Sequence, residues 1–300
     1  MVHKQTLTLF APAKINLFLH ITGKRRDGYH LLDSLVAFAD IGDTITIEPA
    51  PHFSFHITGP FAKYFKDSEQ TEYIDGSNLI TRAVKALSQI TKHPTNFKIT
   101  LDKHLPLASG LGGGSSDAAT ALWGFIQLWS LEKDADYLLP LMLQLGADVP
   151  VCLNCRPTLM RGIGDELQSA PTMPEIPIIL INPMRACPTA DIFLRYNKAF
   201  KPQTTLPTAL TPTDHFIDVL KRHSNDLYMP AIDVLPDIKN IIHALDAQNG
   251  CMLARMSGSG ASCFGLFDTT EHAVHAATII QKENPDWWVK TGYLNRPERY

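Results

Sequence analysis

The sequence lacks the features that would place it in a membrane, on a secretion route or on nucleic acid. Its longest purely aliphatic run spans residues 178–181, far short of the roughly 20 residues that a membrane helix requires. The net charge is only −3, from 27 basic and 30 acidic residues, so no strong field attracts polyanions. The first six residues carry no apolar stretch typical of a signal peptide. We therefore expect a cytoplasmic protein with no membrane partner and no nucleic-acid partner.

The cysteines do not form a pattern typical of a disulfide framework or a metal site. They number five, an odd count, and are scattered through the chain, which favours a reducing compartment. Cys152 and Cys155 form a C-x-x-C pair, but no second ligand pair follows for zinc. A redox pair usually opens a helix, whereas this one ends an apolar, strand-like run. We interpret both cysteines as buried residues without a chemical role.

Apolar periodicity predicts a mixed protein of strands and helices. With 300 residues, 45% of them apolar and 19% charged, the chain can form one large or two ordinary globular domains. The predicted strands cover residues 6–10, 14–22, 43–48, 52–58, 97–101, 158–161, 176–181, 253–256, 262–267 and 287–293, and the predicted helices cover 78–90, 115–129, 134–145, 189–196, 213–223, 237–248 and 272–283. Because the strands cluster rather than alternate with helices, the pattern favours an α+β fold over a doubly wound parallel sheet.

The most informative segment is a glycine-rich loop at residues 106–119. Four glycines fall within residues 110–114, after a predicted strand and before a predicted helix. Glycine lets backbone N–H groups turn into a concave anion site, and the helix start adds unpaired donors. Ser115 or Ser116 can cap that helix. A flexible turn is the alternative, but the flanking strand and helix favour a phosphate site.

The absence of other known phosphate-binding motifs excludes several enzyme classes. The chain contains no G-x-x-x-x-G-K-[ST] motif. The run Gly110-x-Gly112-x-x-Ser115 lacks the third glycine of a dinucleotide fingerprint. The H-R-D and D-F-G motifs of protein kinases are also missing.

Three further segments contain polar residues that could serve a site. Asp148, between Gly146 and Pro150, could accept a proton from a substrate hydroxyl, or it could be an ordinary turn residue. Lys14 and Asn16 lie opposite the apolar face of their predicted strand. That face meets either solvent or a polar pocket in which Lys14 pairs with Asp148. A second small-residue turn, at residues 257–261, could let the backbone approach the glycine loop closely.

In their order along the chain, these segments resemble the three motifs of the GHMP kinases. The motifs correspond to residues 12–17, 106–119 and 256–267. The resemblance implies a two-domain α+β fold, with domains at residues 1–156 and 157–300 and the active site in the cleft between them. It also implies ATP as phosphoryl donor, with Mg²⁺.

Shorter segments resemble one subgroup of this family more closely. They are Gly28-Tyr29-His30 and residues 78–80, 102–106, 145–150 and 225–227. That subgroup phosphorylates a tertiary alcohol, the 2-hydroxyl group of a cytidine diphosphate derivative of methylerythritol, in isoprenoid precursor biosynthesis.

The resemblance assigns a role to each candidate residue. Lys14 and Asp148 would be catalytic. The ATP-binding residues would be Pro106, Leu107, Ala108, Ser109, Gly110, Leu111, Gly112, Gly113, Gly114, Ser115, Ser116 and Asn78, with Ser116 also the candidate Mg²⁺ ligand. The substrate-binding residues would be Asn16, Tyr29, His30, Lys103, Thr189 and Phe193, and among these Tyr29, His30 and Phe193 would hold the cytosine.

Two alternatives stay open at this point. The first is another small-molecule GHMP kinase, of the mevalonate or homoserine type; Tyr29 and His30 argue against it, because those substrates contain no base to stack. The second is a catalytically silent nucleotide-binding relative. Lys14, Asp148 and the complete glycine loop argue against that alternative.

Overall fold

The structure is a computed structural model that describes residues 5–66, 74 and 76–296. Residues 1–4, on which part of the expectation about the amino terminus rests, lie outside the described residues. The strands are β1 (Leu7–Lys24), β2 (His30–Pro49), β3 (Ser54–Thr58), β4 (Phe97–Asp102), β5 (Thr158–Gly162), β6 (Glu166–Ser169), β7 (Ile176–Asn182), β8 (Cys251–Met256), β9 (Cys263–Phe267) and β10 (Trp288–Leu294). The helices are η1 (Ala62–Tyr64), α1 (Leu79–Thr91), α2 (Gly113–Leu128), α3 (Leu138–Leu145), α4 (Val149–Asn154), α5 (Thr189–Leu194), α6 (Thr213–Lys221), α7 (Tyr228–Val234), α8 (Asp237–Asp246) and α9 (Thr270–Glu283).

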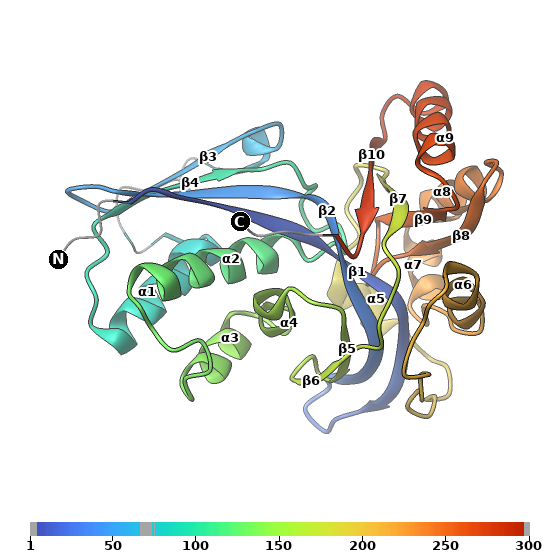
Figure 1. Ribbon diagram of the computed structural model, residues 1–300. Helices are drawn as coiled ribbons and strands as arrows, with labels where there is room; N and C mark the ends of the chain where they lie inside the picture. Colours follow the sequence, from blue (N-terminus) through green and yellow to red (C-terminus); the bar gives the residue numbers. More distant parts are fainter. Residues whose placement is uncertain (1–4, 67–73, 75, 297–300) are drawn as a thin grey trace.

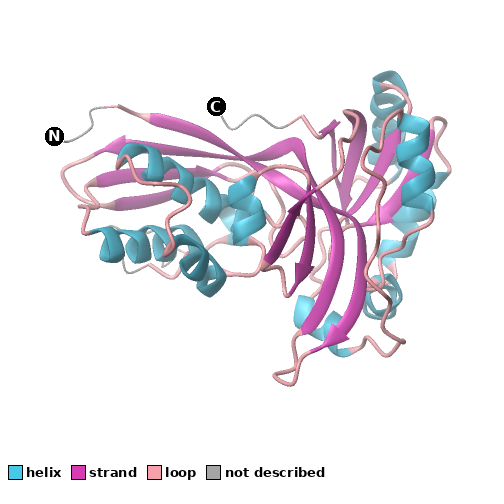
Figure 2. Cartoon of the chain, turned by 60° about the horizontal axis from the view of Figure 1, so that its bottom comes forward, coloured by secondary structure: helices cyan, strands magenta, loops and turns pink. Residues whose placement is uncertain are grey.

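The strands form one mixed sheet around a long hairpin. The sheet order is β3-β4-β2-β10-β7-β9-β8, with β1 and β5 also paired to β2 and β6 paired to β5. Strands β3 and β4 run parallel, and the other pairs are antiparallel. The β1–β2 hairpin extends through the molecule, with α1–α4 gathered at one end and α6–α9 at the other (Figures 1 and 2). The arrangement confirms the α+β prediction.

Separate hydrophobic clusters lie under the two groups of helices. One cluster packs α1–α4 against the sheet and includes Val84, Leu87, Leu122 and Phe125. Another packs α7–α9 against the far strands and includes Ile241. A third cluster lies at the crossing of the hairpin with β7, β9 and α6. The predicted division at residue 156 lies in the loop between α4 and β5 and stays a prediction. Within the described residues, no helix combines the length and the apolar character needed to cross a membrane.

The structure corrects several predicted elements. Residues 31–42 were not predicted as strand, because residues 33–39 are buried on both faces and so lack the alternation of a half-exposed strand. The apolar run before Cys155 is helix α4 rather than a strand, since Pro150 lies in its first turn, where proline favours a helix. The predicted strands at 6–10 and 14–22 form one strand, β1. Helix α7 and strand β6 were not predicted.

Candidate active site

A cavity of about 1070 Å³ brings together most of the predicted site residues. Its wall includes the start of β2, the glycine loop, the first turn of α2, the residue before α4, the start of α5 and the turn after β8. Of the twenty predicted site residues, Leu111 and Ser116 do not line this cavity. The side chain of Leu111 belongs to a hydrophobic core instead. Ser116 is fully buried in α2.

The glycine loop ends in a left-handed turn that starts helix α2. Gly110 and Gly112 have φ angles of +76° and +63°, which favour glycine. Gly112 is the N-cap of α2 and makes no side-chain capping bond. The expectation that Ser115 or Ser116 caps the helix is therefore wrong, because the turn at Gly112 lets the helix begin earlier. Gly113, Gly114 and Ser115 line the cavity, and the first N–H groups of a helix have no partner within it.

The turn at residues 257–261 packs directly against the glycine loop. A Cβ atom on Gly110 would lie 2.6 Å from the carbonyl oxygen of Ser257 and 2.7 Å from that of Gly260. The Ser257 hydroxyl donates to the Gly110 carbonyl oxygen at 3.0 Å. The Ser262 N–H donates to the Ser109 carbonyl oxygen at 2.9 Å. These contacts confirm the close approach that the small residues predicted.

Lys14 and Asp148 form an ion pair in the cavity wall. The Lys14 Nζ atom lies 2.7 Å from Asp148 Oδ1. The Lys14 side chain is 5% exposed and the Asp148 side chain 35%. The Lys14 N–H also donates to the Leu111 carbonyl oxygen at 2.8 Å, which joins β1 to the glycine loop. The predicted pairing of these two side chains, 134 residues apart, is confirmed.

Asn16 lies two residues along β1 and also lines the cavity. Its Nδ2 atom donates to the Ser34 hydroxyl at 2.8 Å. Its Oδ1 atom is buried and has no hydrogen-bond partner. This acceptor is available to a ligand that supplies a hydroxyl or amine hydrogen.

Aromatic residues form another part of the wall. Tyr29 lies just before β2 and is 62% exposed, while the His30 ring lies against Phe193 with centroids 5.5 Å apart. Burial and the nearby Lys24 lower the pKa of His30, so its imidazole is neutral at pH 7 and can donate and accept one hydrogen bond each. Thr189 at the start of α5 shares a hydrogen bond of 2.8 Å with the Ser259 hydroxyl.

Lys103 is held by two carboxylates beneath the first turn of α2. Its Nζ atom lies 2.6 Å from Asp43 Oδ2 and 2.5 Å from Asp117 Oδ2. Burial lowers the pKa of Lys103, but the two carboxylates outweigh burial and keep it raised. Burial raises the pKa of Asp117 well above its usual range, with Lys103 opposing. Lys103 lines the cavity as predicted, although its charge is already paired.

Sequence reasoning missed an apolar part of the wall. Phe65, Leu79 and Leu107 line it; Leu107 and Leu79 belonged to motifs at residues 106–119 and 78–80, but neither Phe65 nor Leu79 was predicted as a site residue. Asn78 lies beside them and caps α1, its side chain accepting from the Ile80 N–H at 2.9 Å. Single apolar residues far apart in a sequence carry no signal that they share a cavity.

Two family models match separate parts of the chain. The GHMP kinases N terminal domain matches residues 78–156, and the GHMP kinases C terminal model matches residues 217–286. The first contains the glycine loop and Asp148, and the second contains the turn at residues 257–261. Together with the cavity, these matches define an ATP-dependent small-molecule kinase of the GHMP class.

Individual relatives narrow this class. The 4-diphosphocytidyl-2-C-methyl-D-erythritol kinase of Rhizobium etli is 42% identical over 93% of this chain and 92% of its own length. The enzyme of that name from Cereibacter sphaeroides is 45% identical, over 93% of this chain and 96% of its own. The chain belongs to the family of 4-diphosphocytidyl-2-C-methyl-D-erythritol kinases, as its motifs indicated.

Solved structures agree with this assignment. A crystal structure of 4-(cytidine 5'-diphospho)-2C-methyl-D-erythritol kinase superposes with a TM-score of 0.77 and 30% identity, covering 97% of this chain and all of the other. A homoserine kinase from Cytophaga hutchinsonii superposes with a TM-score of 0.67 and 20% identity, over 100% of this chain and 98% of its own. The second likeness concerns the fold alone.

Proposed function

We propose that the protein transfers the γ-phosphoryl group of ATP to the tertiary 2-hydroxyl group of 4-diphosphocytidyl-2-C-methyl-D-erythritol. This reaction belongs to isoprenoid precursor biosynthesis by the methylerythritol phosphate pathway. The observation that carries the proposal is a single cavity lined by the glycine loop, by the Lys14–Asp148 pair and by the aromatic residues Tyr29, His30 and Phe193. The names of the relatives support the same substrate.

The ATP phosphates would lie against the glycine loop and the first turn of α2. Unpaired N–H groups and the positive end of the helix dipole favour a polyanion there. The apolar side chains of Phe65, Leu79 and Leu107 offer a surface for the adenine ring, beside Asn78. This arrangement assigns adenosine and phosphates to adjoining parts of the cavity.

Lys14 and Asp148 would act on the acceptor alcohol. Phosphoryl transfer needs mainly positioning and neutralisation of charge. The Asp148 carboxylate, a third exposed, can orient the hydroxyl group and accept its proton. Lys14, held at 2.7 Å, keeps the carboxylate in place and offsets charge on the transferred group.

The aromatic residues would hold the cytosine. The exposed Tyr29 ring can stack on a base, and the neutral His30 can exchange hydrogen bonds with the base edge. Phe193 lies against His30 and can cover the other face of the base. Asn16 Oδ1 and Thr189 are further polar groups that could bind the acceptor.

The oxygen donors in the cavity fit Mg²⁺ that enters with ATP. Within the described residues, no group of three or more histidine, cysteine, aspartate or glutamate side chains can hold a metal ion, and Mg²⁺ on nucleotides keeps phosphate and water ligands. Ser115 lines the cavity and would supply a protein oxygen. The Ser116 hydroxyl has no hydrogen-bond partner but does not reach the cavity, which argues for Ser115 instead. When bound, the ion would neutralise phosphate charge.

The cytoplasm is the compartment we propose for this activity. The odd number of cysteines, scattered through the sequence, favours a reducing compartment. We also propose the two-domain division at residues 1–156 and 157–300. Limited proteolysis at that boundary would test the division.

A coupled assay of ADP release tests the proposed reaction. The purified protein receives Mg·ATP and one acceptor: the cytidylyl alcohol, mevalonate or homoserine. We expect turnover with the cytidylyl alcohol alone. Turnover only with mevalonate or homoserine would contradict the proposed substrate. The absence of turnover with every acceptor, in a folded protein that binds ATP, would identify a silent relative.

A further inference from the structure

Asn225 belongs to a segment of the sequence that the proposed reaction leaves without a role. It lies between α6 and α7, and it is only 6% exposed. It is not among the residues that line the cavity. Its side chain nevertheless makes three hydrogen bonds, and two of them link it to the turn beside the site.

The amide of Asn225 spans the turn that follows β8. Its Nδ2 atom donates to the carbonyl oxygens of Met256 at 2.9 Å and Gly258 at 2.7 Å. Its Oδ1 atom accepts from the Leu227 N–H at 3.0 Å. Both hydrogens of the amide nitrogen are used, so this orientation of the side chain satisfies every donor. The bonds fix the backbone on either side of Ser257.

Ser257 carries this restraint into the cavity wall. Its hydroxyl oxygen accepts from the Asn16 N–H at 3.1 Å and donates to the Gly110 carbonyl oxygen at 3.0 Å. Gly258, whose carbonyl oxygen Asn225 binds, has a φ angle of +56°. The position of the glycine loop therefore depends on the turn, and the turn is held by Asn225.

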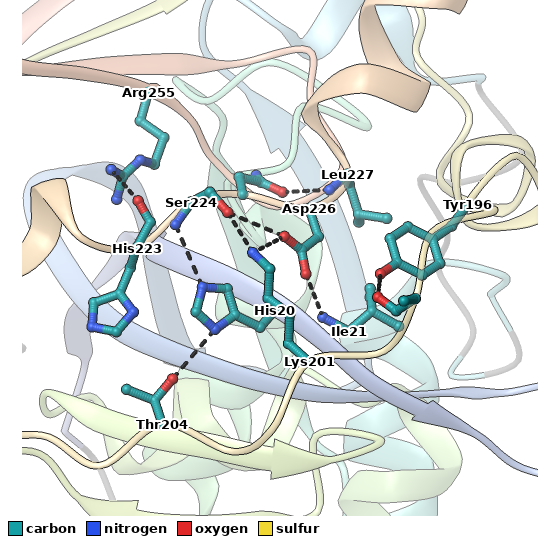
Figure 3. A network of polar contacts seen from close by, with 12 residues as sticks. His20, Ile21, Tyr196, Lys201, Thr204, His223, Ser224, Asp226, Leu227 and Arg255 are labelled. Atoms are coloured by element: carbon teal, nitrogen blue, oxygen red, sulfur yellow. Dashed lines mark hydrogen bonds and ion pairs between the residues drawn. The ribbon is translucent and has the colours of Figure 1, made fainter.

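The segment that carries Asn225 is itself fixed to β1. The Asp226 N–H donates to the Leu19 carbonyl oxygen at 2.8 Å, and Asp226 Oδ2 accepts from the Ile21 N–H at 3.0 Å. Asp226 Oδ1 lies 2.5 Å from Lys201 Nζ. Figure 3 shows this carboxylate between Lys201 and Ile21. Asn225 is thus attached to the strand that also carries Lys14.

We propose that Asn225 is a positioning residue for the ATP phosphates, which acts through Ser257 on the glycine loop. The inference rests on the proposed function. Losing the two amide donors leaves two buried carbonyl oxygens unpaired. Each unpaired oxygen should change the equilibria of folding and ATP binding, taken together, by roughly 5- to 150-fold. Because part of that loss falls on protein stability, we expect ATP affinity to weaken about 10- to 100-fold. We expect CMP affinity to change much less, because the bond that joins the turn to α5, between the Ser259 and Thr189 hydroxyl groups, uses neither of the carbonyl oxygens that Asn225 binds.

Calorimetry with Asn225→Asp tests the proposal. The carboxylate has the same shape but faces two carbonyl oxygens without a donor. The matched control is Asn284→Asp, which removes a similar bond, 3.1 Å from Nδ2 to the Ile280 carbonyl oxygen, at a residue that does not line the cavity. We expect Asn225→Asp to lose ATP affinity while keeping that for CMP, and Asn284→Asp to keep both. Equal ATP affinity in the two variants, or equal loss of ATP and CMP affinity in Asn225→Asp, would overturn the proposal.

Ser257→Ala provides a second test that does not depend on the folding of the first variant. It removes the hydrogen bonds of the hydroxyl group with Asn16 and Gly110 and should lower ATP affinity in the same way. The double variant with Asn225→Asp should lose less than the product of the two single losses, because both act through one contact. Unchanged ATP affinity in Ser257→Ala would overturn the proposal. Since nucleotide binding is measured without an acceptor, failure of the proposed substrate would appear separately, as missing turnover in the wild type.

Discussion

Replacing Asp148 with asparagine tests whether its carboxylate accepts the proton of the acceptor hydroxyl group. The substitution keeps an oxygen near Lys14, whose Nζ atom lies 2.7 Å away, but removes the negative charge and most of the basicity. Loss of a general base lowers turnover by about 10²- to 10⁴-fold. The Lys14 side chain is only 5% exposed and would keep a hydrogen bond to the amide oxygen but lose its partner charge, so the free energy of unfolding should fall by about 1–3 kcal/mol. We expect ATP affinity to change little.

Rapid-quench measurement of a single turnover separates this chemical step from product release. The matched control is Asp237→Asn, which breaks the exposed 2.7 Å pair with Arg185 outside the cavity. Turnover of the control should equal that of the wild type. Near wild-type turnover in a folded Asp148→Asn variant would refute the role of this carboxylate.

Three further predictions concern the glycine loop, the cytosine site and the effect of pH on stability. Gly110→Ala should lower the free energy of unfolding by at least about 1–2 kcal/mol, because Gly110 has a positive φ angle and a Cβ atom there would meet the backbone of the neighbouring turn. Gly114→Ala should raise it by about 0.5–1 kcal/mol, because Gly114 lies in helix α2 with open space around it. Urea titrations that rank the two variants the other way would contradict this. Tyr29→Ala should raise the KM for the cytidylyl alcohol about 5- to 150-fold and leave the KM for ATP unchanged. In the same initial-rate assay, the control Tyr64→Ala should have no effect, because Tyr64 does not line the cavity. Equal changes in the two KM values of Tyr29→Ala would refute stacking on the cytosine. Burial lowers the pKa of His20 from 6.5 to about 4, so the unfolded chain takes up the proton first. Stability should be full above pH 6.5 and fall by up to about 3 kcal/mol toward pH 4; a His20→Asn variant with the same pH dependence would contradict this.

Local chemistry in the sequence was enough to predict the centre of the site. The glycine run between a strand and a helix indicated an anion site, and alternation on β1 placed Lys14 on the polar face. The pairing of Lys14 with Asp148 was one of two alternatives that the residue types left open, and the resemblance to the GHMP kinases favoured it, because no local pattern fixes a contact across 134 positions. The sheet order was beyond reach for the same reason.

The errors came from segments whose surroundings override local preference. The middle of β2 is buried on both faces, so its sequence lacks a period of two. Helix α4 contains Val149 and Val151, which favour strands, yet Pro150 in its first turn and its packing against α2 make it helical. The true N-cap, Gly112, was hidden because serine is the commoner capping residue.

Contacts between a side chain and a distant part of the backbone could not be predicted from the sequence either. Asn225 contacts the carbonyl oxygens of residues about thirty positions away, and nothing in its neighbourhood predicts that. The apolar wall near Phe65 is formed only when η1, α1 and the glycine loop come together. Sequence motifs thus predicted groups that could touch substrate better than groups that hold them in place.

The central claim is that one cavity holds two nucleotides at separate places, and inhibition by CDP tests it most directly. Initial rates are measured with CDP against varied cytidylyl alcohol at fixed ATP, and then against varied ATP at fixed alcohol. We predict that CDP competes with the alcohol and does not compete with ATP. Competition with ATP alone would contradict the assignment of Tyr29 and His30 to the cytosine, and with it the proposed substrate.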